Sequence, residues 1–385
     1  KALGKPLRKD NKQEVYSPES TMERFTKFKT MIFPREVIVG HNTTDQIKGM
    51  CNHLAPSNKV LLVCDKNTKK ISGDRIEKIL SGAGYDINMV VLSLPLIRRD
   101  VLPAWPTIRE VNTVVKEAKR TGSDFLLGVG GGSVIDVTKC ATYELSTNFI
   151  SVPTSASHDG MASPRAALKD KKGSISKTAV SPMAVLADTA VIMKAPYRML
   201  ASGCADVISN LTAVKDWELA HRLKDEEFST FAASLSTTSS QLLLNKAEDI
   251  RTGLEEAVWQ AIKCMVVSGV AMSVAGNTRP ASGAEHMFSH MLDSIAPGKA
   301  LHGEQCGVGS IMMMYLHGGD WQQIRDALKM IGAPTTAKEL NIPKKKIIQA
   351  LMGAQKIRPD RYTILGELGL TEDAAKKLAK ITGVI

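Results

Sequence analysis

The chain has 385 residues, which is too long for one ordinary hydrophobic core, so we expect two domains. Hydrophobic residues make up 43% of it and charged residues 23%, as is typical of globular proteins that fold in water. No run of about eighteen apolar residues occurs, so we expect no membrane-spanning segment. Residues 1–30 form a basic N-terminal extension that lacks the apolar stretch of a secretory signal.

The formal net charge of +11 narrows the class of partner. A basic surplus suits nucleic acid, but it equally suits small anions such as phosphates. Aromatic residues make up only 5% of the chain, and the basic clusters at 169–172 and 343–347 lack interleaved aromatic side chains that stack on bases. We therefore expect no nucleic-acid partner. The six cysteines form no CxxC pair, which indicates reduced, buried thiols and a cytoplasmic protein.

Short β-branched runs alternate with segments of helical periodicity in the first half of the chain. Strands separated by helices of this length predict a parallel sheet in a Rossmann-like α/β domain. We expect strands at 36–40, 59–65, 86–94, the start of 124–145, 148–157 and 184–192, and helices at 75–84, 107–122 and the end of 124–145. The helix at 107–122 places Ile108, Val111, Val115 and Ala118 on one face. Residues 162–180 predict a hairpin that turns between Asp170 and Gly173.

After Pro196 the pattern becomes helical throughout. Helical periodicity runs through 204–224, 254–276, 307–318, 321–332 and 372–383. We therefore expect an α/β dinucleotide-binding domain over 1–195 and an all-α domain that binds metal and substrate over 196–385.

The stretch "GVGGGSVID", residues 128–136, follows a buried strand and opens an amphipathic helix. Glycines there let backbone amides approach a pyrophosphate at the positive end of a helix, although a tight turn without a ligand has the same pattern. Asp65 ends a strand where a carboxylate can bind an adenosine ribose. The neighbouring Lys66, Lys69 and Lys70 suit a 2′-phosphate instead, so NAD and NADP both stay open.

Three of the eight histidines fall within "SGAEHMFSHMLDSIAPGKALHGEQ", residues 282–305. His286 and His290 are four apart and share one face if the segment is helical. His302 comes just before the start of another helix. A catalytic zinc takes three protein ligands and an open position, and the third ligand can be a carboxylate. Asp206, placed at the head of the first C-terminal helix, is that candidate, unless it is an ordinary acidic residue favoured by the helix dipole.

Together these motifs resemble the archaeal sn-glycerol-1-phosphate dehydrogenase family, part of the larger group of dehydroquinate synthase, glycerol dehydrogenase and iron-containing alcohol dehydrogenases. The resemblance runs from about residue 36 to the C-terminus and rests on "GVGGGSVID", "SVPTSASHDGMASP", "GCADVISNLTAVKDWELA", "RPASGAEHMFSHMLD" and "LHGEQCGVGSIMMMYLHG". It implies an active site in a cleft between the two domains. It also implies a homo-oligomer that is not inserted into a membrane.

The resemblance assigns roles to particular residues. It implies one Zn²⁺ per subunit on Asp206, His286 and His302, with His290 and Asp159 beside the substrate and Asp206 counted among the catalytic residues. The implied contacts of NADH or NADPH are Asp65, Gly130, Gly131, Gly132, Ser133, Val134, Ile135, Asp136, Thr154, Ser155, Ala156, Ser157 and Ser163. The chain departs from the family at His158, where relatives commonly have Asn, and in its longer N-terminal extension.

The implied reaction is the reversible reduction of dihydroxyacetone phosphate to sn-glycerol 1-phosphate, the backbone of archaeal ether lipids. A Zn²⁺ would polarise the ketone oxygen, although an Asp/His/His set also accepts nickel or iron. The substrate phosphate needs a cation or amide, for which we consider Arg279, Lys215 and Asn210 first and Arg358 and Arg361 next. A related enzyme acting on an unphosphorylated polyol or alcohol is the alternative. Dehydroquinate synthase, a nucleic-acid-binding protein and a non-catalytic dinucleotide sensor fit less well.

Overall fold

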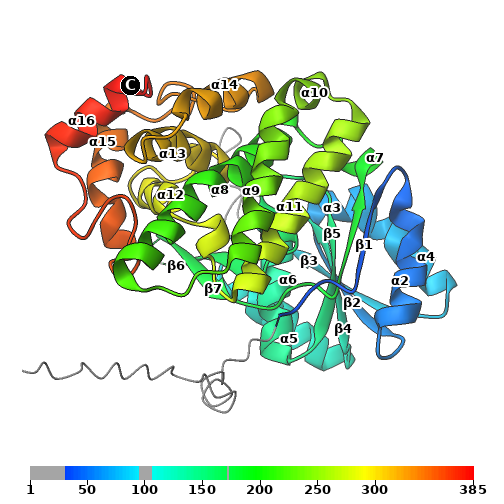
Figure 1. Ribbon diagram of the computed structural model, residues 1–385. Helices are drawn as coiled ribbons and strands as arrows, with labels where there is room; N and C mark the ends of the chain where they lie inside the picture. Colours follow the sequence, from blue (N-terminus) through cyan, green and yellow to red (C-terminus); the bar gives the residue numbers. More distant parts are fainter. Residues whose placement is uncertain (1–30, 95–105, 171–172) are drawn as a thin grey trace, which may run out of the picture. The chain divides into compact units, whose positions relative to one another are not determined.

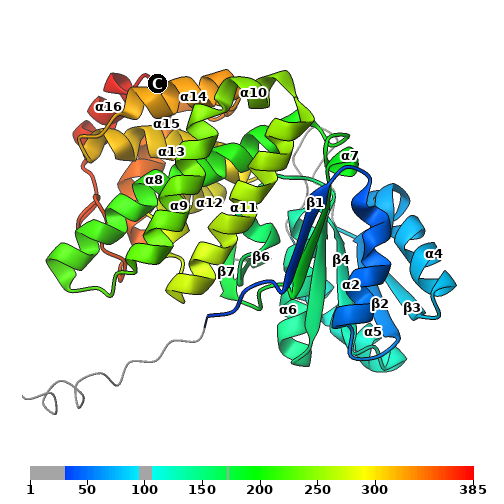
Figure 2. The ribbon, with the colours of Figure 1, turned by 45° about the vertical axis from the view of Figure 1, so that its right-hand side comes forward.

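The computed structural model describes residues 31–94, 106–170 and 173–385. Residues 31–385 form one compact unit, and the N-terminal extension lies outside the described residues. Within this unit a parallel sheet and its helices come first along the chain and a helical region follows, as Figures 1 and 2 show. The prediction of an α/β region followed by a helical region is therefore confirmed.

Among the described residues, six strands form one sheet in which every pairing is parallel. Their order across the sheet is β1-β8-β5-β4-β2-β3. The strands are β1 Glu36–Gly40, β2 Lys59–Asp65, β3 Asp86–Leu92, β4 Phe125–Gly130, β5 Asn148–Pro153 and β8 Ala184–Asp188. All residues of β4 are buried, because helices cover both faces of the sheet.

Neighbouring side chains of a strand point to opposite faces, and the two faces have different helices. Leu61 and Val63 of β2 pack into one hydrophobic cluster with α5 Ile108–Thr121 and α6 Gly132–Leu145. Leu62 packs into another cluster with α2 Ile47–Leu54 and α4 Asp74–Gly82.

Three local predictions have a clear outcome. The hairpin is confirmed, since β6 Arg165–Asp170 and β7 Gly173–Thr178 pair antiparallel. The predicted face of α5 was partly wrong, because Ile108 is 44% exposed and Val114 is buried instead. The predicted strand at 184–192 was too long. It ends at Asp188, whose carboxylate accepts a hydrogen bond from the Ala190 N–H and so starts the short helix α7 Thr189–Ile192.

The helical region is arranged around α8 Tyr197–Lys224, which packs against α9 and α13. Its other helices are α9 Thr230–Asn245, α10 Ala247–Thr252, α11 Glu255–Ala275, α12 Ala284–Ile295, α13 His302–Leu316, α14 Trp321–Ile331, α15 Lys344–Gly353 and α16 Glu372–Ile381. Of the described helices, α11 alone is long and apolar enough to cross a membrane, but 72% of its apolar window is buried within the protein. It is a core helix that packs against α9. The change from sheet to helices falls between α7 and α8, and a domain boundary at 195/196 stays a prediction.

Candidate active site

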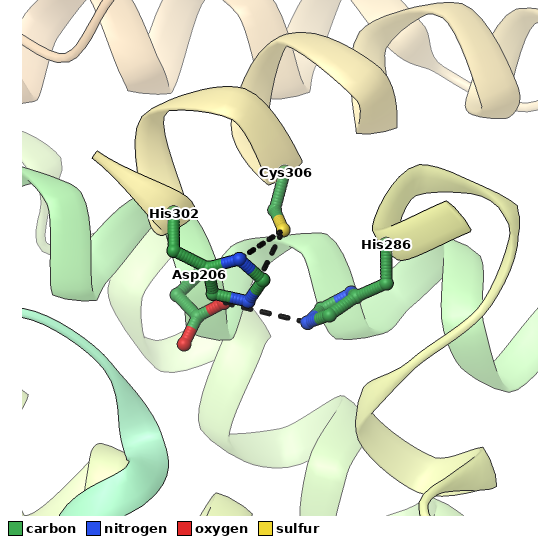
Figure 3. A group of neighbouring side chains, drawn as sticks. All are labelled: Asp206, His286, His302 and Cys306. Carbon is green, nitrogen blue, oxygen red and sulfur yellow. Dashed lines mark hydrogen bonds and ion pairs between the residues drawn. The ribbon is translucent and has the colours of Figure 1, made fainter. Parts of the chain in front are cut away.

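Helix α8 and the consecutive helices α12 and α13 bring Asp206, His286 and His302 together (Figure 3). Asp206 lies on α8, His286 on α12, and His302 is the first residue of α13. Nε2 of His286 is 3.6 Å from Oδ1 of Asp206, and Nε2 of His302 is 3.7 Å from the same oxygen. One carboxylate oxygen thus faces two imidazole nitrogens, an arrangement that suits a divalent cation between them.

The carboxylate of Asp206 is well suited to a metal ion because one of its two oxygens accepts no hydrogen bond from the described residues. Asp206 is 2% exposed, and its Oδ2 accepts a hydrogen bond from the Asp159 N–H at 3.1 Å. Its Oδ1 is buried and, among the described residues, has no hydrogen-bond partner. A buried carboxylate oxygen left in this way is costly, and a bound cation would remove that cost.

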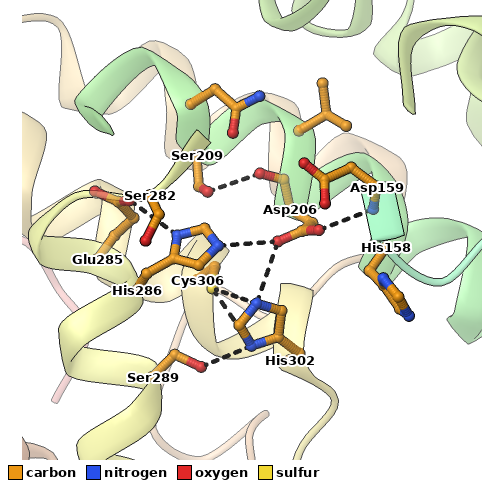
Figure 4. Close-up of polar contacts among 12 residues, drawn as sticks. His158, Asp159, Asp206, Ser209, Ser282, Glu285, His286, Ser289, His302 and Cys306 are labelled. Atoms are coloured by element: carbon orange, nitrogen blue, oxygen red, sulfur yellow. Dashed lines mark hydrogen bonds and ion pairs between the residues drawn. The ribbon is translucent and has the colours of Figure 1, made fainter. Parts of the chain in front are cut away.

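Partners on the far side of each imidazole set the direction in which its Nε2 points (Figure 4). Nδ1 of His286 is 2.9 Å from Oε1 of Glu285, and Nδ1 of His302 is 3.2 Å from the Ser289 hydroxyl. Burial, reinforced by the neighbouring His286, lowers the pKa of His302 well below the ordinary histidine value. Neutral His302 therefore presents the Nε2 lone pair that a metal ion needs.

Cys306 lies beside this group and was not among the predicted site residues. Its Sγ is 3.6 Å from Nε2 and 3.9 Å from Nδ1 of His302, so the sulfur is nearly equally far from both ring nitrogens and does not lie along the lone pair of either. Burial raises the pKa of the Cys306 thiol to about 12, so the thiol is neutral. We therefore take Asp206, His286 and His302 as the candidate ligands and Cys306 as a packing neighbour.

The position of Asp206 in its helix differs from the sequence prediction. Helix α8 begins at Tyr197, so Asp206 lies in the helix interior rather than at its head. The alternative interpretation, a carboxylate favoured by the positive end of a helix, is therefore wrong. The predicted spacing on α12 is confirmed, because His286 and His290 both lie on that helix and both line the same cavity.

A cavity of about 820 Å³ joins the histidines to the carboxyl ends of the sheet strands. Asp65 at the end of β2 and Gly131 after β4 both line it. The chain leaves β2 toward β3 on one side and returns to β4 on the other, so the strand order reverses between β2 and β4. Ligands of open parallel sheets bind at such a reversal.

Most of the predicted dinucleotide contacts line this cavity. They are Asp65, Gly131, Gly132, Ser133, Val134, Asp136, Thr154, Ser155, Ser157 and Ser163. Gly130, Ile135 and Ala156 do not line it. Ile135 and Ala156 belong to the hydrophobic core, and a Cβ on Gly130 would lie 2.6 Å from Cβ of Val134. Gly130 is therefore needed for close packing of the strand against the helix, which is a structural role.

His158, the residue that departs from the family pattern, packs against the glycine loop. A Cβ on Gly132 would lie 1.8 Å from Nε2 of His158, so only glycine fits there. Nδ1 of His158 accepts a hydrogen bond from the Gly160 N–H at 2.8 Å, which fixes the ring in this position. The imidazole therefore forms part of the cavity wall beside the start of α6.

Asp65 also starts the short helix α3 Lys66–Thr68. Its Oδ1 accepts hydrogen bonds from the backbone N–H groups of Asn67 at 2.7 Å and Thr68 at 2.9 Å. None of Lys66, Lys69 and Lys70 lines the cavity within the described part of the chain, and Lys69 is paired with Asp74. The carboxylate therefore has the better placement for a ribose contact.

A buried ion pair that the sequence did not reveal connects the two sides of the cavity. Lys139 of α6 is fully buried, and its ammonium lies 3.2 Å from Oδ1 of Asp136. It also donates to the carbonyl oxygens of Gly160 and, at 2.7 Å, Arg165. Oδ2 of Asp136 accepts from the Ala167 N–H at 3.0 Å. The pair therefore holds segment 159–167, which carries Asp159, against the glycine-loop helix.

Asp159 and His290, the predicted substrate contacts, both line the cavity. Oδ2 of Asp159 accepts a hydrogen bond from the Ser268 hydroxyl at 2.7 Å. Burial, with Asp206 adding to it, raises the pKa of the Asp159 carboxyl to about 6. The ring of His290 is 5.8 Å, centroid to centroid, from that of His302, and burial lowers its pKa well below the ordinary histidine value.

The first three phosphate candidates do not line the cavity. Arg279 is buried and donates to both carboxylate oxygens of Glu226 and to the Tyr362 carbonyl. Lys215 is exposed on α8, and Asn210 donates to the Ser268 hydroxyl at 2.8 Å. These three assignments are not supported.

Arg358 and Arg361, the other two candidates for binding the substrate phosphate, lie at the cavity or its wall. Arg358 lines the cavity, and Arg361 supports its wall by donating to the Ser282 carbonyl at 2.5 Å and to the Thr278 hydroxyl at 2.7 Å. Arg165, which was not predicted, lines the cavity as well.

Comparisons with known proteins agree on the family. Residues 38–196 match the model of the iron-containing alcohol dehydrogenase family. Glycerol-1-phosphate dehydrogenase (NAD(P)+) of Methanococcoides burtonii is 50% identical over 357 residues, which are 93% of this chain and 97% of that protein. The enzyme of the same name from Thermococcus sibiricus is 50% identical over 355 residues, 92% of this chain and 98% of the other.

Solved structures agree on the fold. A probable glycerol dehydrogenase from Sinorhizobium meliloti 1021 superposes with a TM-score of 0.76 at 20% identity, covering 93% of this chain and all of that one. Identity at this level shows the fold alone. The sequence relatives show more, and the chain belongs to the glycerol-1-phosphate dehydrogenase family within the iron-containing alcohol dehydrogenases.

Proposed function

We propose that this protein is an NAD(P)H- and metal-dependent sn-glycerol-1-phosphate dehydrogenase. It reduces dihydroxyacetone phosphate reversibly and so supplies the backbone of archaeal ether lipids. One observation carries the proposal: a single cavity is lined both by the glycine loop at the end of the sheet and by His286 and His302, which lie beside Asp206. A nicotinamide and a ketone substrate held beside these three residues could therefore meet in one enclosed space, as hydride transfer requires.

The metal would be held by Asp206, His286 and His302, and we infer that it is zinc, one per subunit. The three ligands offer one carboxylate oxygen and two imidazole nitrogens, a donor set that fits a catalytic zinc. When bound, the zinc stabilises negative charge on the ketone oxygen as a Lewis acid, and NAD(P)H is the hydride source.

The dinucleotide would lie along the carboxyl ends of β2 and β4. The free N–H groups at the first turn of α6, at Gly132 and Ser133, are placed for its pyrophosphate, and the helix dipole adds to the attraction. Asp65 would accept hydrogen bonds from the adenosine ribose. The hydroxyls of Thr154 and Ser155, both on the cavity wall, would bind the nicotinamide half.

Asp159 and His290 would orient the substrate next to the metal ligands. Asp159 is held by Ser268 through its side chain and by Asp206 through its backbone N–H, so its carboxyl group has a fixed position. His290 is half-buried and lines the cavity, so the accessible part of its imidazole would form a hydrogen bond with a substrate hydroxyl. We also infer a cytoplasmic homo-oligomer without a nucleic-acid partner.

Product configuration tests the function directly. Zinc-loaded protein is incubated with dihydroxyacetone phosphate and with NADH or NADPH in parallel, and the enantiomer of the glycerol phosphate formed is determined by chiral chromatography. We expect sn-glycerol 1-phosphate alone and no comparable oxidation of glycerol. Formation of the 3-phosphate enantiomer would reject the proposal, and oxidation of glycerol in preference to glycerol 1-phosphate would support a polyol dehydrogenase.

A further inference from the structure

We propose that Gln305 positions His302 for metal binding by fixing which of its ring nitrogens carries hydrogen. Acting through the Ser289 hydroxyl, Gln305 keeps the hydrogen of the neutral imidazole on Nδ1 and leaves the lone pair of Nε2 free. This inference rests on the proposed function, because His302 is a candidate ligand of the proposed zinc, and it extends that function to a positioning residue on α13.

Helices α12 and α13 each supply two side chains to one continuous series of hydrogen bonds. Ser289 and Asp293 lie four residues apart on α12, and His302 and Gln305 lie three apart on α13, so each pair shares one face of its helix. The two helices pack against each other. Ser289 and Gln305 are fully buried and Asp293 is 6% exposed, so the series lies in the interface between the helices.

The far end of the series sets the orientation of the Gln305 amide. Nε2 of Gln305 donates to the Ala300 carbonyl oxygen at 3.3 Å and to Oδ1 of Asp293 at 3.1 Å. A backbone carbonyl oxygen only accepts hydrogen bonds, so the NH2 group must face it. The reverse orientation would place Oε1 of Gln305 against the Ala300 oxygen, where both atoms are acceptors. Oε1 therefore faces Ser289.

The direction of the remaining hydrogen bonds follows from this orientation. Ser289 has one hydroxyl hydrogen, which it donates to Oε1 of Gln305 at 2.8 Å. The Ser289 oxygen is then left to accept, and its partner is Nδ1 of His302 at 3.2 Å (Figure 4). Nδ1 therefore carries the hydrogen of the imidazole. In a neutral ring the other nitrogen, Nε2, then has a free lone pair.

The surroundings of Nε2 agree with this tautomer. Nε2 of His302 is 3.7 Å from Oδ1 of Asp206, which is too far for a hydrogen bond, and that oxygen accepts no hydrogen bond from the described residues. A hydrogen on Nε2 would occupy the direction in which the nitrogen has to meet a cation. The tautomer with hydrogen on Nδ1 is therefore the one that binds metal.

Ser289 alone does not determine the tautomer, because a hydroxyl group can either donate or accept. The other histidine ligand differs in this respect. Nδ1 of His286 faces Oε1 of Glu285, and an ionised carboxylate only accepts. His302 has a neutral partner that becomes an acceptor only because Gln305 takes its hydrogen. The metal site therefore depends on Gln305, although this side chain acts through another residue.

The first test measures zinc affinity by competition with a chromophoric chelator. Gln305→Met keeps the length and the buried volume of the side chain but leaves the Ser289 hydroxyl free to donate to Nδ1. Ser289→Ala removes the acceptor. We expect each variant to bind zinc about tenfold more weakly than wild type, as is typical when the partner of a histidine ligand is lost. Matched controls are Gln322→Met, exposed on α14, and Ser294→Ala, exposed on α12, where the hydroxyl donates to the His290 carbonyl at 3.1 Å. Both should keep the wild-type affinity.

The second test observes the tautomer directly in metal-free protein. Histidine labelled with 15N is incorporated, and the two ring nitrogens of His302 are identified by their absence from the spectrum of His302→Ala. At about pH 8, above the ordinary histidine pKa of about 6.5, we expect wild type to show hydrogen on Nδ1 and a lone pair on Nε2. In Gln305→Met the spectrum should move toward the opposite tautomer. This measurement needs no loss of stability to be interpreted, because wild type alone can contradict the proposal.

The two tests separate this inference from the proposed function, since neither requires cofactor or turnover. Hydrogen on Nε2 in metal-free wild type, or the same zinc affinity in wild type, Gln305→Met and Ser289→Ala, would overturn the role of Gln305 even in an active enzyme. A protein that shows the expected tautomer and the expected loss of zinc affinity but does not reduce dihydroxyacetone phosphate would sink only the proposed function.

Discussion

Oε1 of Glu285 lies 2.9 Å from Nδ1 of His286, the residue that follows it on α12. Glu285 is fully buried, and its carboxylate also accepts hydrogen bonds from the Thr212 hydroxyl at 2.8 Å and from the Gly283 N–H at 2.6 Å. A carboxylate held this firmly fixes the tautomer of His286, so that its Nε2 points toward Asp206. Buried carboxylates in this role raise the affinity of histidine ligands for metal ions.

We predict that Glu285→Gln weakens metal binding by about 10- to 100-fold, because an amide polarises the imidazole less than a carboxylate does. Competition with a chromophoric chelator measures the affinity. Glu339→Gln is a matched control, since Glu339 also accepts backbone hydrogen bonds, from Thr335 and Thr336, but is exposed and lies outside the cavity lining. Equal zinc affinity in Glu285→Gln and wild type would remove Glu285 from this role.

Loss of the ligand Asp206 from α8, or of the ligand His302 from α13, should remove the metal and leave the dinucleotide site intact. We predict that Asp206→Ala and His302→Ala are purified without stoichiometric metal and without turnover, while NADH still binds within about threefold of the wild-type affinity. Elemental analysis and quenching of protein fluorescence by NADH measure the two properties. Cys306→Ala is the control for local packing and should keep its metal, because we take Cys306 as a neighbour of His302 and not as a ligand. Stoichiometric metal in Asp206→Ala would mean that the ligands are assigned wrongly.

His290 is placed for the substrate rather than for the metal. We predict that His290→Ala keeps a full complement of metal and raises KM or lowers kcat by about 10- to 100-fold, because a hydrogen bond to the substrate is lost. Elemental analysis beside steady-state kinetics tests both parts. A variant that loses its metal would show that His290 and His286 have been exchanged in the assignment.

Much of the fold was predictable from local sequence patterns, because the central strands are buried on both faces. Such strands are continuous apolar runs with β-branched residues, as in β2, which contains Val60, Leu61, Leu62 and Val63. The spacing of His286 and His290 likewise predicted their common helix face. Family motifs then pointed to Asp206 and His302, which local patterns alone could not relate to each other.

The remaining features depend on contacts between distant segments, which local patterns do not contain. Asp206 was placed at a helix start because α8 is buried on most sides and has little amphipathic pattern to mark its true beginning at Tyr197. Arg279 looked available until the structure paired it with Glu226, 53 residues away. The burial of Lys139 was not predictable from its neighbour Asp136 alone, since two of its other partners are the distant backbone carbonyls of Gly160 and Arg165.

Asp293 provides a test of how burial changes stability with pH. The residue lies on α12 and is 6% exposed, its Oδ1 accepts a hydrogen bond from Nε2 of Gln305 at 3.1 Å, and its Oδ2 has no partner among the described residues. Burial raises the pKa of this carboxyl from 3.8 to about 7, although the Gln305 hydrogen bond opposes the change. The folded protein therefore holds a proton on Asp293 at pH values where the unfolded chain has lost it.

The higher pKa of Asp293 in the folded protein means that the free energy of unfolding falls as the pH rises. Below pH 3.8 the carboxyl is protonated in both states, and between that pH and about 7 each pH unit removes about 1.4 kcal/mol from the free energy of unfolding. Asn keeps the shape and the hydrogen bond but cannot ionise. We predict that Asp293→Asn gains several degrees in Tm relative to wild type between pH 5 and pH 8, measured by scanning calorimetry. Asp373 is exposed and serves as the control, so the difference in Tm between Asp373→Asn and wild type should be the same at pH 5 and pH 8. If the difference in Tm between Asp293→Asn and wild type does not change with pH, Asp293 ionises in the folded protein as easily as in the unfolded chain. Solvent or a cation would then reach its free oxygen.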